Sequence, residues 1–114
     1  MQYMLLIYNE TPAAPPTEAQ SEAIYAEYTA YTDDLRKRGA MVEGAPLAAP
    51  SSATTVRVRN GNRMVTDGPF AETKEWLGGY YVIEAQSLDH ALEAAAMCPG
   101  AKYGSIEIRP VAGM

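Results

Sequence analysis

The sequence predicts an α+β domain in which two helices cover one face of an antiparallel sheet. Three observations lead to this prediction. Short apolar or alternating segments typical of strands recur along the chain, two segments combine helical periodicity with capping signals, and the two kinds of element follow one another in a definite order. The length of 114 residues fits a single domain that spans residues 1–114.

The chain begins with a predicted strand and a predicted helix. Residues 3–8 form an apolar run that fits a central strand covered on both faces. Thr17 and Gln20 stand at the spacing of a capping box, in which each side chain bonds the other residue's main-chain N–H. The helix that follows has an apolar face made of Ile24, Tyr28, Tyr31 and Leu35. Gly39 supplies a left-handed residue that ends it.

The middle of the chain predicts an edge strand and a hairpin. Residues 41–47 form a weak strand, because glycine and proline interrupt them. Residues 55–59 alternate between apolar and charged side chains, and residues 62–66 return as the partner strand. Asn60 and Gly61 lie between them, and both tolerate the positive φ of a tight hairpin turn.

The last part of the chain predicts a loop, a strand, a helix and a final strand. Residues 67–79 are expected to form a long irregular connection, which in a small domain is more often functional than most loops. Residues 80–85 form a strand, and Ser87 caps a helix that stops at the Pro-Gly pair of residues 99–100. Its expected inner face comprises Leu88, Ala91, Leu92 and Ala95. Residues 105–109 alternate as the last strand.

The element order is thus β-α-β-β-α-β with an inserted hairpin, which is the order of a ferredoxin-like domain. Two helices cover only one face of such a sheet. Residues 3–8 and 80–83 are apolar at both parities, so the second face also carries apolar side chains. We therefore predict a homodimer in which two sheets pack face to face.

Charge and composition exclude several classes of function. Nine Lys and Arg against fourteen Asp and Glu give a net charge of −5, so we expect no nucleic-acid partner. The longest apolar run is too short to cross a membrane, and the N-terminus lacks the features of a secretory signal. The single Cys98 fits a reducing compartment, and we expect a cytoplasmic protein. Cys98 and the single His90 supply no metal site, and no cofactor motif is present.

Four segments carry a resemblance to a known family. Residues 67–75 read DGPFAETKE, residues 77–80 read LGGY, residues 3–8 read YMLLIY and residues 106–110 read IEIRP. With these segments the chain resembles the DGPF family of YCII-related proteins over essentially its whole length.

The resemblance implies a dimeric α+β barrel, which agrees with the architecture expected from the element order. It also implies a link to extracytoplasmic-function sigma factors, beside which relatives occur, and an enzymatic role through a His–Asp pair in the broader YCII group. The histidine of that pair does not carry over, because this chain has only His90, in the second predicted helix. Asp67 carries over as the motif aspartate.

Asp67 has two interpretations. In the first it shapes a turn, with its carboxylate accepting main-chain N–H groups, while Gly68 and Pro69 set the dihedral angles and Phe70 anchors the loop to the core. In the second it is a catalytic acid or base, or a ligand anchor, at the mouth of a pocket.

The other candidate site residues are assigned to ligand binding. Trp76 offers a flat apolar wall, and Lys74 offers a positive charge for an anionic group. The alternative is a solvated loop with weak surface ion pairs. Strand tyrosines fit either an aromatic pocket or a plain interface. The full set of ligand-binding candidates is Tyr8, Phe70, Lys74, Glu75, Trp76, Tyr81 and Arg109.

Three functions remain open at this point. The first is a small-molecule-binding or regulatory domain with a pocket near the loop that contains Asp67. The second is a cofactor-independent enzyme of lyase, isomerase or monooxygenase type that uses Asp67 as acid or base; this rests on analogy with other barrels. The third is a protein-interaction module, which predicts an apolar patch that stays exposed after dimerisation.

Overall fold

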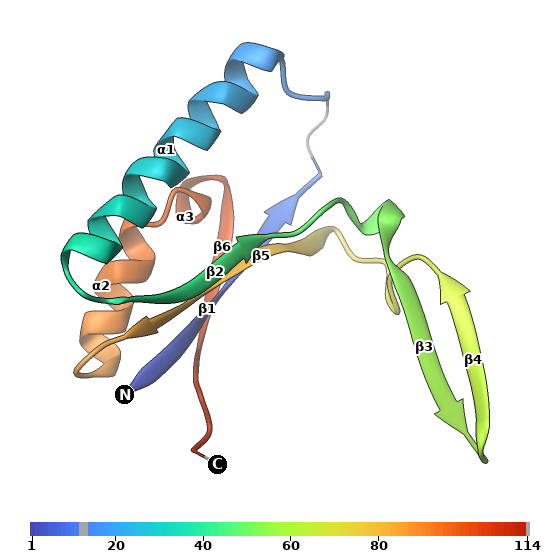
Figure 1. Ribbon diagram of the computed structural model, residues 1–114. Helices are drawn as coiled ribbons and strands as arrows, with labels where there is room; N and C mark the ends of the chain where they lie inside the picture. The colour runs from blue at the N-terminus through green and yellow to red at the C-terminus, as the bar shows by residue number, and fades with distance from the viewer. Residues whose placement is uncertain (12–13, 114) are drawn as a thin grey trace.

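The structure is a computed structural model that describes residues 1–11 and 14–113. Its centre is a four-stranded antiparallel sheet with the strand order β2-β5-β1-β6. The α-helices lie on one side of this sheet (Figure 1). The main elements are β1 (Gln2–Glu10), α1 (Glu18–Lys37), β2 (Met41–Pro46), β5 (Glu75–Glu84), α2 (Leu88–Met97), α3 (Gly100–Tyr103) and β6 (Gly104–Pro110). This is the predicted α+β, ferredoxin-like arrangement.

The two central strands are β1 and β5, and the apolar run at residues 3–8 predicted this place for β1. Tyr3, Leu5 and Ile7 are buried in the core beneath the helices. Successive residues of a strand point to opposite faces, so the residues between them face away from the helices. The edge strand β2 corresponds to the weak strand expected at residues 41–47.

Helix α1 begins and ends as predicted. The Thr17 N–H donates to Gln20 Oε1 at 2.9 Å, and the Gln20 N–H donates to Thr17 Oγ1 at 3.1 Å, so the capping box is complete. Gly39, just beyond the end of the helix, has a φ of 70°, the left-handed conformation that glycine adopts without strain. Tyr31 and Leu35 of the predicted apolar face are buried.

Helix α2 confirms its predicted cap but only part of its predicted inner face. The Ser87 hydroxyl oxygen accepts the His90 N–H at 3.3 Å. Ala91 and Ala95 are buried, whereas Leu88 and Leu92 are 52% and 50% exposed. The buried stripe is narrow because it consists of small residues one turn apart, so the leucines stand at the flanks of the helix.

The Pro-Gly pair at residues 99–100 ends α2 but also starts α3, which the sequence does not predict. Gly100 is buried, and a Cβ on it would lie 2.7 Å from Tyr28 Oη and 2.8 Å from Ile7 Cγ2. The chain therefore passes so close to the core here that only glycine fits. This tertiary contact has no signal in the local sequence.

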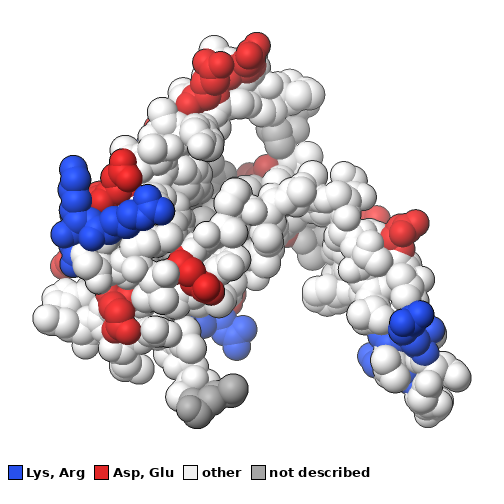
Figure 2. All heavy atoms as spheres, in the orientation of Figure 1, with Lys and Arg blue, Asp and Glu red and all other residues white. Residues whose placement is uncertain are grey.

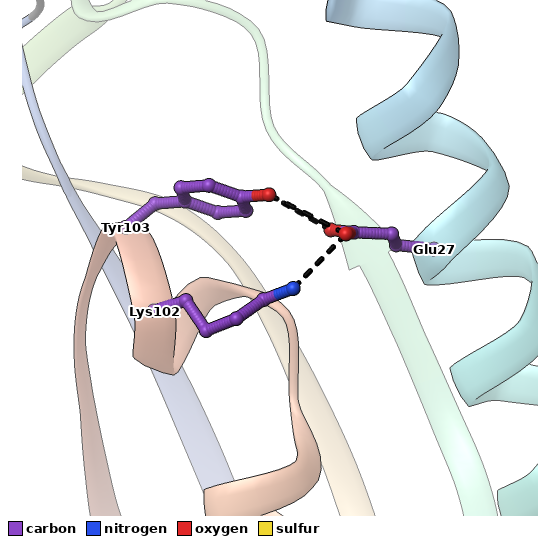
Figure 3. Close-up of polar contacts among 3 residues, drawn as sticks. All are labelled: Glu27, Lys102 and Tyr103. Atoms are coloured by element: carbon purple, nitrogen blue, oxygen red, sulfur yellow. Dashed lines mark hydrogen bonds and ion pairs between the residues drawn. The ribbon is translucent and has the colours of Figure 1, made fainter.

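Polar contacts join α3 to α1 (Figure 3). Lys102 Nζ donates to Glu27 Oε1 at 3.0 Å, and the Tyr103 hydroxyl donates to Glu27 Oε2 at 3.1 Å. The hydrogen bond from Lys102 holds the pKa of Glu27 below its ordinary value, and the same bond raises the pKa of Lys102.

Tyrosines and Cys98 fill the core between the helices and the sheet. The rings of Tyr31 and Tyr81 meet edge to face with their centroids 5.4 Å apart. The Tyr31 hydroxyl donates to Ala94 O at 2.7 Å, and the Tyr81 hydroxyl lies 2.8 Å from Thr32 Oγ1. Burial raises the pKa of Tyr31, Tyr81 and Cys98, because the low-dielectric core disfavours their charged forms.

A second, two-stranded sheet projects from the body (Figure 1). It consists of β3 (Thr54–Arg59) and β4 (Asn62–Asp67), preceded by a short 3₁₀ helix, Pro50–Ser52. We call the hairpin, residues 54–67, the arm. Its turn is confirmed, with φ of 53° at Asn60 and 77° at Gly61. The arm extends the molecule to 46 × 43 × 18 Å.

The connection predicted at residues 67–79 is shorter than expected, because β5 begins at Glu75. The irregular part covers residues 68–74, which we call the DGPF loop. Pairing of β1 with β5 continues to Glu10 and Glu75 across a bulge in which Gly78 is the extra residue. The bulge breaks the alternation of side chains, and this hides the start of the strand in the sequence.

Candidate functional site

The candidate site lies on the face of the sheet opposite the helices, which we call the open face. Met4, Leu6 and Tyr8 of β1 alternate with the buried residues of that strand and so belong to this face. Register places the other members opposite them: Glu43 and Ala45 of β2, Glu75, Leu77, Tyr80 and Val82 of β5, and Ser105, Glu107 and Arg109 of β6.

The centre of the open face is apolar. Val82 is buried, yet it does not belong to the core cluster beneath the helices. Its β1 partner Met4, together with Leu6, Tyr8 and Tyr80, is half-buried in a single chain. Aliphatic side chains next to two tyrosine rings form a surface that can bury more area against a ligand or another protein.

Polar groups of β5 and β6 border this apolar centre. Ser105 is paired with Tyr8 in the β1–β6 ladder, and its hydroxyl donates to Glu75 Oε1 at 3.4 Å. Arg109 is paired with Met4 and is exposed. The structure thus places three predicted residues, Tyr8, Glu75 and Arg109, on one face, and it adds Ser105, which sequence reasoning missed. The alternation of residues 105–109 could have found it, since Ser105 and Arg109 share a parity.

Asp67 is the last residue of β4, and its side chain is exposed at the base of the arm. Among residues 1–11 and 14–113, no N–H group donates to its carboxylate, so the predicted turn role of this side chain is wrong. The main chain holds the turn: the Gly68 N–H donates to Ala53 O at 2.7 Å, and the Thr55 hydroxyl donates to Gly68 O at 2.8 Å. Gly68 has a φ of 94°, which fits its predicted conformational role.

Phe70 does not anchor the DGPF loop to the core. Its side chain is 78% exposed, so that part of the turn interpretation is wrong for the single chain. The loop runs over the surface between the arm and β5 and offers the ring no apolar pocket of its own. Lys74 in the same loop is exposed as well. Their assignment to ligand binding stays a prediction.

Trp76 stands on the other side of β5 from Glu75. It pairs with Asn9, and a Cβ on Gly78 would collide with Asn9 Nδ2 and lie 3.3 Å from Trp76 Cζ3. Gly78 therefore lies in a bulge where its neighbours approach closely. Trp76, which is half-buried, packs over this glycine rather than lining the open face.

Tyr81 belongs to the helix side of the sheet and not to the open face. It is 8% exposed and packs against Tyr31, as described above. It pairs with Leu5 and so shares the covered face, which separates it from Tyr8 and Arg109. Its assignment to ligand binding stays a prediction. Its neighbour Tyr80 lies on the open face instead. An apolar run shows no parity, so the sequence does not indicate which of two adjacent tyrosines faces outward.

Two surface hollows of about 270 and 350 Å³ lie away from the open face. The first is bordered by exposed His90 and by Arg38 and Glu84; the second lies between α1 and the start of α3. Neither contains a predicted site residue. Within residues 1–11 and 14–113, no three His, Cys, Asp or Glu residues are grouped as metal ligands. None of the helices in this part of the chain is both long and apolar enough to span a membrane.

The fold and the open face define a class of protein: a small ferredoxin-like α+β domain whose helices leave one sheet face uncovered. A family model for the YCII-related domain matches residues 1–114, and the chain belongs to this family, as its resemblance implied. An uncharacterized protein of Rhizobium meliloti (strain 1021) is 36% identical over 115 residues, covering 98% of this chain and 93% of that protein. These matches lend no support to a link with sigma factors.

A solved structure with a similar fold is that of 5-chloro-2-hydroxyhydroquinone dehydrochlorinase from Burkholderia phenoliruptrix AC1100, in complex with 2,5-dihydroxybenzoquinone. The TM-score is 0.55, and the match covers 98% of this chain and 94% of that one. At 16% sequence identity the likeness is one of fold.

Proposed function

We propose that the chain is a cytoplasmic homodimer that binds a small aromatic, oxygen-rich molecule between the open face and the DGPF loop. The observation that carries this proposal is the composition of the open face. Half-buried Tyr8 and Tyr80 lie beside aliphatic side chains, with Glu75, Ser105 and Arg109 at the border. Ligand pockets combine an apolar lining with a few polar groups in this way.

Each group has a chemical task in this proposal. The tyrosine rings stack on a flat ligand. The Arg109 guanidinium pairs with a carboxylate or phenolate oxygen of the ligand. The Glu75 carboxylate accepts a hydrogen bond from a ligand hydroxyl, and the Ser105 hydroxyl donates one to it. Phe70 and Lys74 of the DGPF loop cover the ligand from the arm side, and Trp76 fixes the strand beside Glu75.

A second candidate is a cofactor-independent enzyme on the same site, of lyase, isomerase or monooxygenase type. It is favoured by Asp67, whose carboxylate is exposed and accepts no hydrogen bond from the part of the chain that the structure describes. Such a carboxylate is free to accept the proton of a ligand hydroxyl. The solved enzyme with a similar fold carries a dihydroxybenzoquinone, which belongs to the same chemical class as the proposed ligand.

Binding is tested by the shift in melting temperature with 2,5-dihydroxybenzoquinone and a panel of hydroxybenzoates. A ligand of the folded state raises the melting temperature. We expect Tyr8→Ala and Arg109→Gln to remove the shift, while Arg36→Gln on α1, far from the open face, retains it. No shift with any compound, or a shift that both site variants keep, would overturn the proposal.

The Asp67→Asn variant separates binding from catalysis. If the chain is an enzyme, this variant keeps the thermal shift but no longer consumes a chlorinated hydroquinone that the wild type consumes. If the wild type binds compounds of the panel but consumes neither these nor the chlorinated hydroquinone, the enzymatic candidate fails and the binding proposal stands.

A further inference from the structure

The arm exposes an apolar face. Val56 lies directly opposite Val65, and Val58 opposite Arg63, so the three valines share one side of the hairpin. Each of them is 60% exposed. Arg63 shares the valine side, whereas Arg57 and Arg59 occupy the other side with Met64. A β-branched face is typical of strands that pack against another surface.

The arm has little cover within its own chain. All six residues of β4 are exposed, and so are all residues of β3 except Thr55. A single hairpin is marginally stable in water, since two strands bury too little apolar area to offset the entropy of ordering them. A well-formed arm of this length therefore needs a second surface against its valine face.

The net charge of the arm indicates that the surface that covers its valine face is acidic. The arm carries three arginines and one aspartate, a net charge of +2, whereas the rest of the chain carries six basic and thirteen acidic residues, a net charge of −7. Figure 2 shows the basic residues gathered toward the tip of the arm and a wide gap between the arm and the body. The body of a second copy has the complementary charge.

The accessible surface area of the chain favours the same partner for the arm, a second copy of the chain. The accessible surface of the chain is 8227 Å², against about 6,100 Å² for a compact protein of its mass. The excess, about 2,000 Å² in each chain, lies in the range that permanent homodimers bury.

We infer that the arm clasps a second copy of this chain, with its valine face on the body of the partner and with Arg63, which shares that face, against partner carboxylates. The two-fold symmetry of a homodimer makes this contact reciprocal, so each copy gives one arm and receives one. The DGPF loop at the base of the arm then lies at the junction of the two copies, and the ligand site is incomplete in one chain. This inference rests on the homodimer proposed above and adds the arm as a second contact between its two copies.

The test is the dimer dissociation constant, measured by sedimentation equilibrium at two salt concentrations. Two variants probe the arm. In the first, Arg57, Arg59 and Arg63 become Gln. In the second, a short Gly-Ser linker replaces residues 54–67, which is feasible because the Gly68 N–H bonds Ala53 O at 2.7 Å. The matched control replaces Arg36, Lys37 and Arg38, at the C-terminal end of α1, with Gln and changes the net charge equally.

We expect the arginine variant to weaken the dimer about tenfold and to reduce its salt dependence, because attraction between opposite charges is lost. The linker variant weakens it further, and the control matches the wild type. Circular dichroism checks that each variant keeps its helices.

Three outcomes contradict the inference about the arm. They differ in whether they also contradict the pairing of open faces in the homodimer. If both arm variants dimerise like the wild type, the arm inference fails and the pairing of open faces stands. If the wild type is monomeric, both fail. If the arginine variant keeps its dimer but loses an affinity of the wild type for duplex DNA, the arm serves nucleic acid and the inference is wrong.

Discussion

Gly78 is a residue at which any side chain would displace its neighbours. A Cβ there would collide with the Asn9 amide and press on the Trp76 ring. The same bulge sets where β5 carries Glu75 and Leu77 onto the open face. The position of the candidate site therefore depends on this glycine.

We predict that Gly78→Ala lowers the free energy of unfolding by about 1–3 kcal/mol, the usual effect of overpacking. Urea denaturation measures the change. Gly113→Ala is the control, because a Cβ on Gly113 meets nothing within 4 Å. Equal stability of the two variants would show that Asn9 and Trp76 move aside without cost.

Tyr31 links stability to alkaline pH. Burial raises its pKa above the ordinary value of 10.0, so the folded state holds the phenol proton that the unfolded state releases. The contribution of Tyr31 is complete below pH 10 and is lost as the pH rises through the higher pKa of the folded state.

We predict that Tyr31→Phe costs about 1 kcal/mol at pH 8, because the hydrogen bond to Ala94 is lost. This cost should shrink as the pH rises above 10, since phenylalanine has no proton to release. Urea titrations at pH 8 and above pH 10 measure the difference, with exposed Tyr25→Phe as the control. A cost that stays constant across this range would contradict the raised pKa.

At this scale the sequence predicted residue types better than their orientations. Tyr8, Glu75 and Arg109 lie on the open face as a candidate site requires, whereas Tyr81 faces the helices and Tyr80 takes its place. Alternate residues of a strand face opposite sides of the sheet. A run that is apolar at every position does not show which of its residues face which side. The surroundings of Phe70 could not be predicted from the sequence either. An aromatic residue in a loop gives no signal of whether it packs against its own chain or against another molecule.

Among the elements, α3 depends most on contacts distant in sequence. It has only four residues, so its own hydrogen bonds cannot stabilise it, and Glu27 of α1 holds both Lys102 and Tyr103 (Figure 3). The sequence gives strong signals for α1, through its capping box, and for the hairpin turn. It gives none for α3, because the partners lie 75 residues apart.

We predict that Glu27→Gln lowers the melting temperature at pH 7 and that this difference disappears in acid. The pKa of Glu27 is lowered in the folded state, so its contribution is present above its ordinary value of 4.5 and is lost as the pH falls through the lower folded value. Melting curves of both proteins between pH 7 and pH 3 measure this. Glu22→Gln, on the same helix, is the control, and a pH-independent difference would contradict the ion pair.

The whole molecule is too extended for a compact chain of its length. Its radius of gyration is 16.1 Å, against about 13 Å expected. The projecting arm accounts for this shape, and both the arm and the open face carry apolar side chains. The sequence anticipated an uncovered sheet face from the number of helices, but the direction of the arm depends on the short segments that join it to β2 and β5, whose geometry no residue pattern encodes.

We predict that Leu6→Lys weakens self-association. Leu6 lies at the centre of the open face between Tyr80 and Glu107. A lysine there is tolerated in a single chain, where the position is half-exposed, but its charge would be buried between two sheets. The dissociation constant should rise about a hundredfold or more. Leu92→Lys on α2, also half-exposed, should associate like the wild type, and equal behaviour of both variants would remove Leu6 from the interface.

The most direct measurement is the molar mass of the wild-type chain in solution, by sedimentation velocity at micromolar concentrations. Since one chain has a mass of 12.3 kDa, a particle of twice this mass is the predicted result. A homogeneous 12.3 kDa particle at tens of micromolar would contradict the account, because the open face would then be stable in water without a second copy.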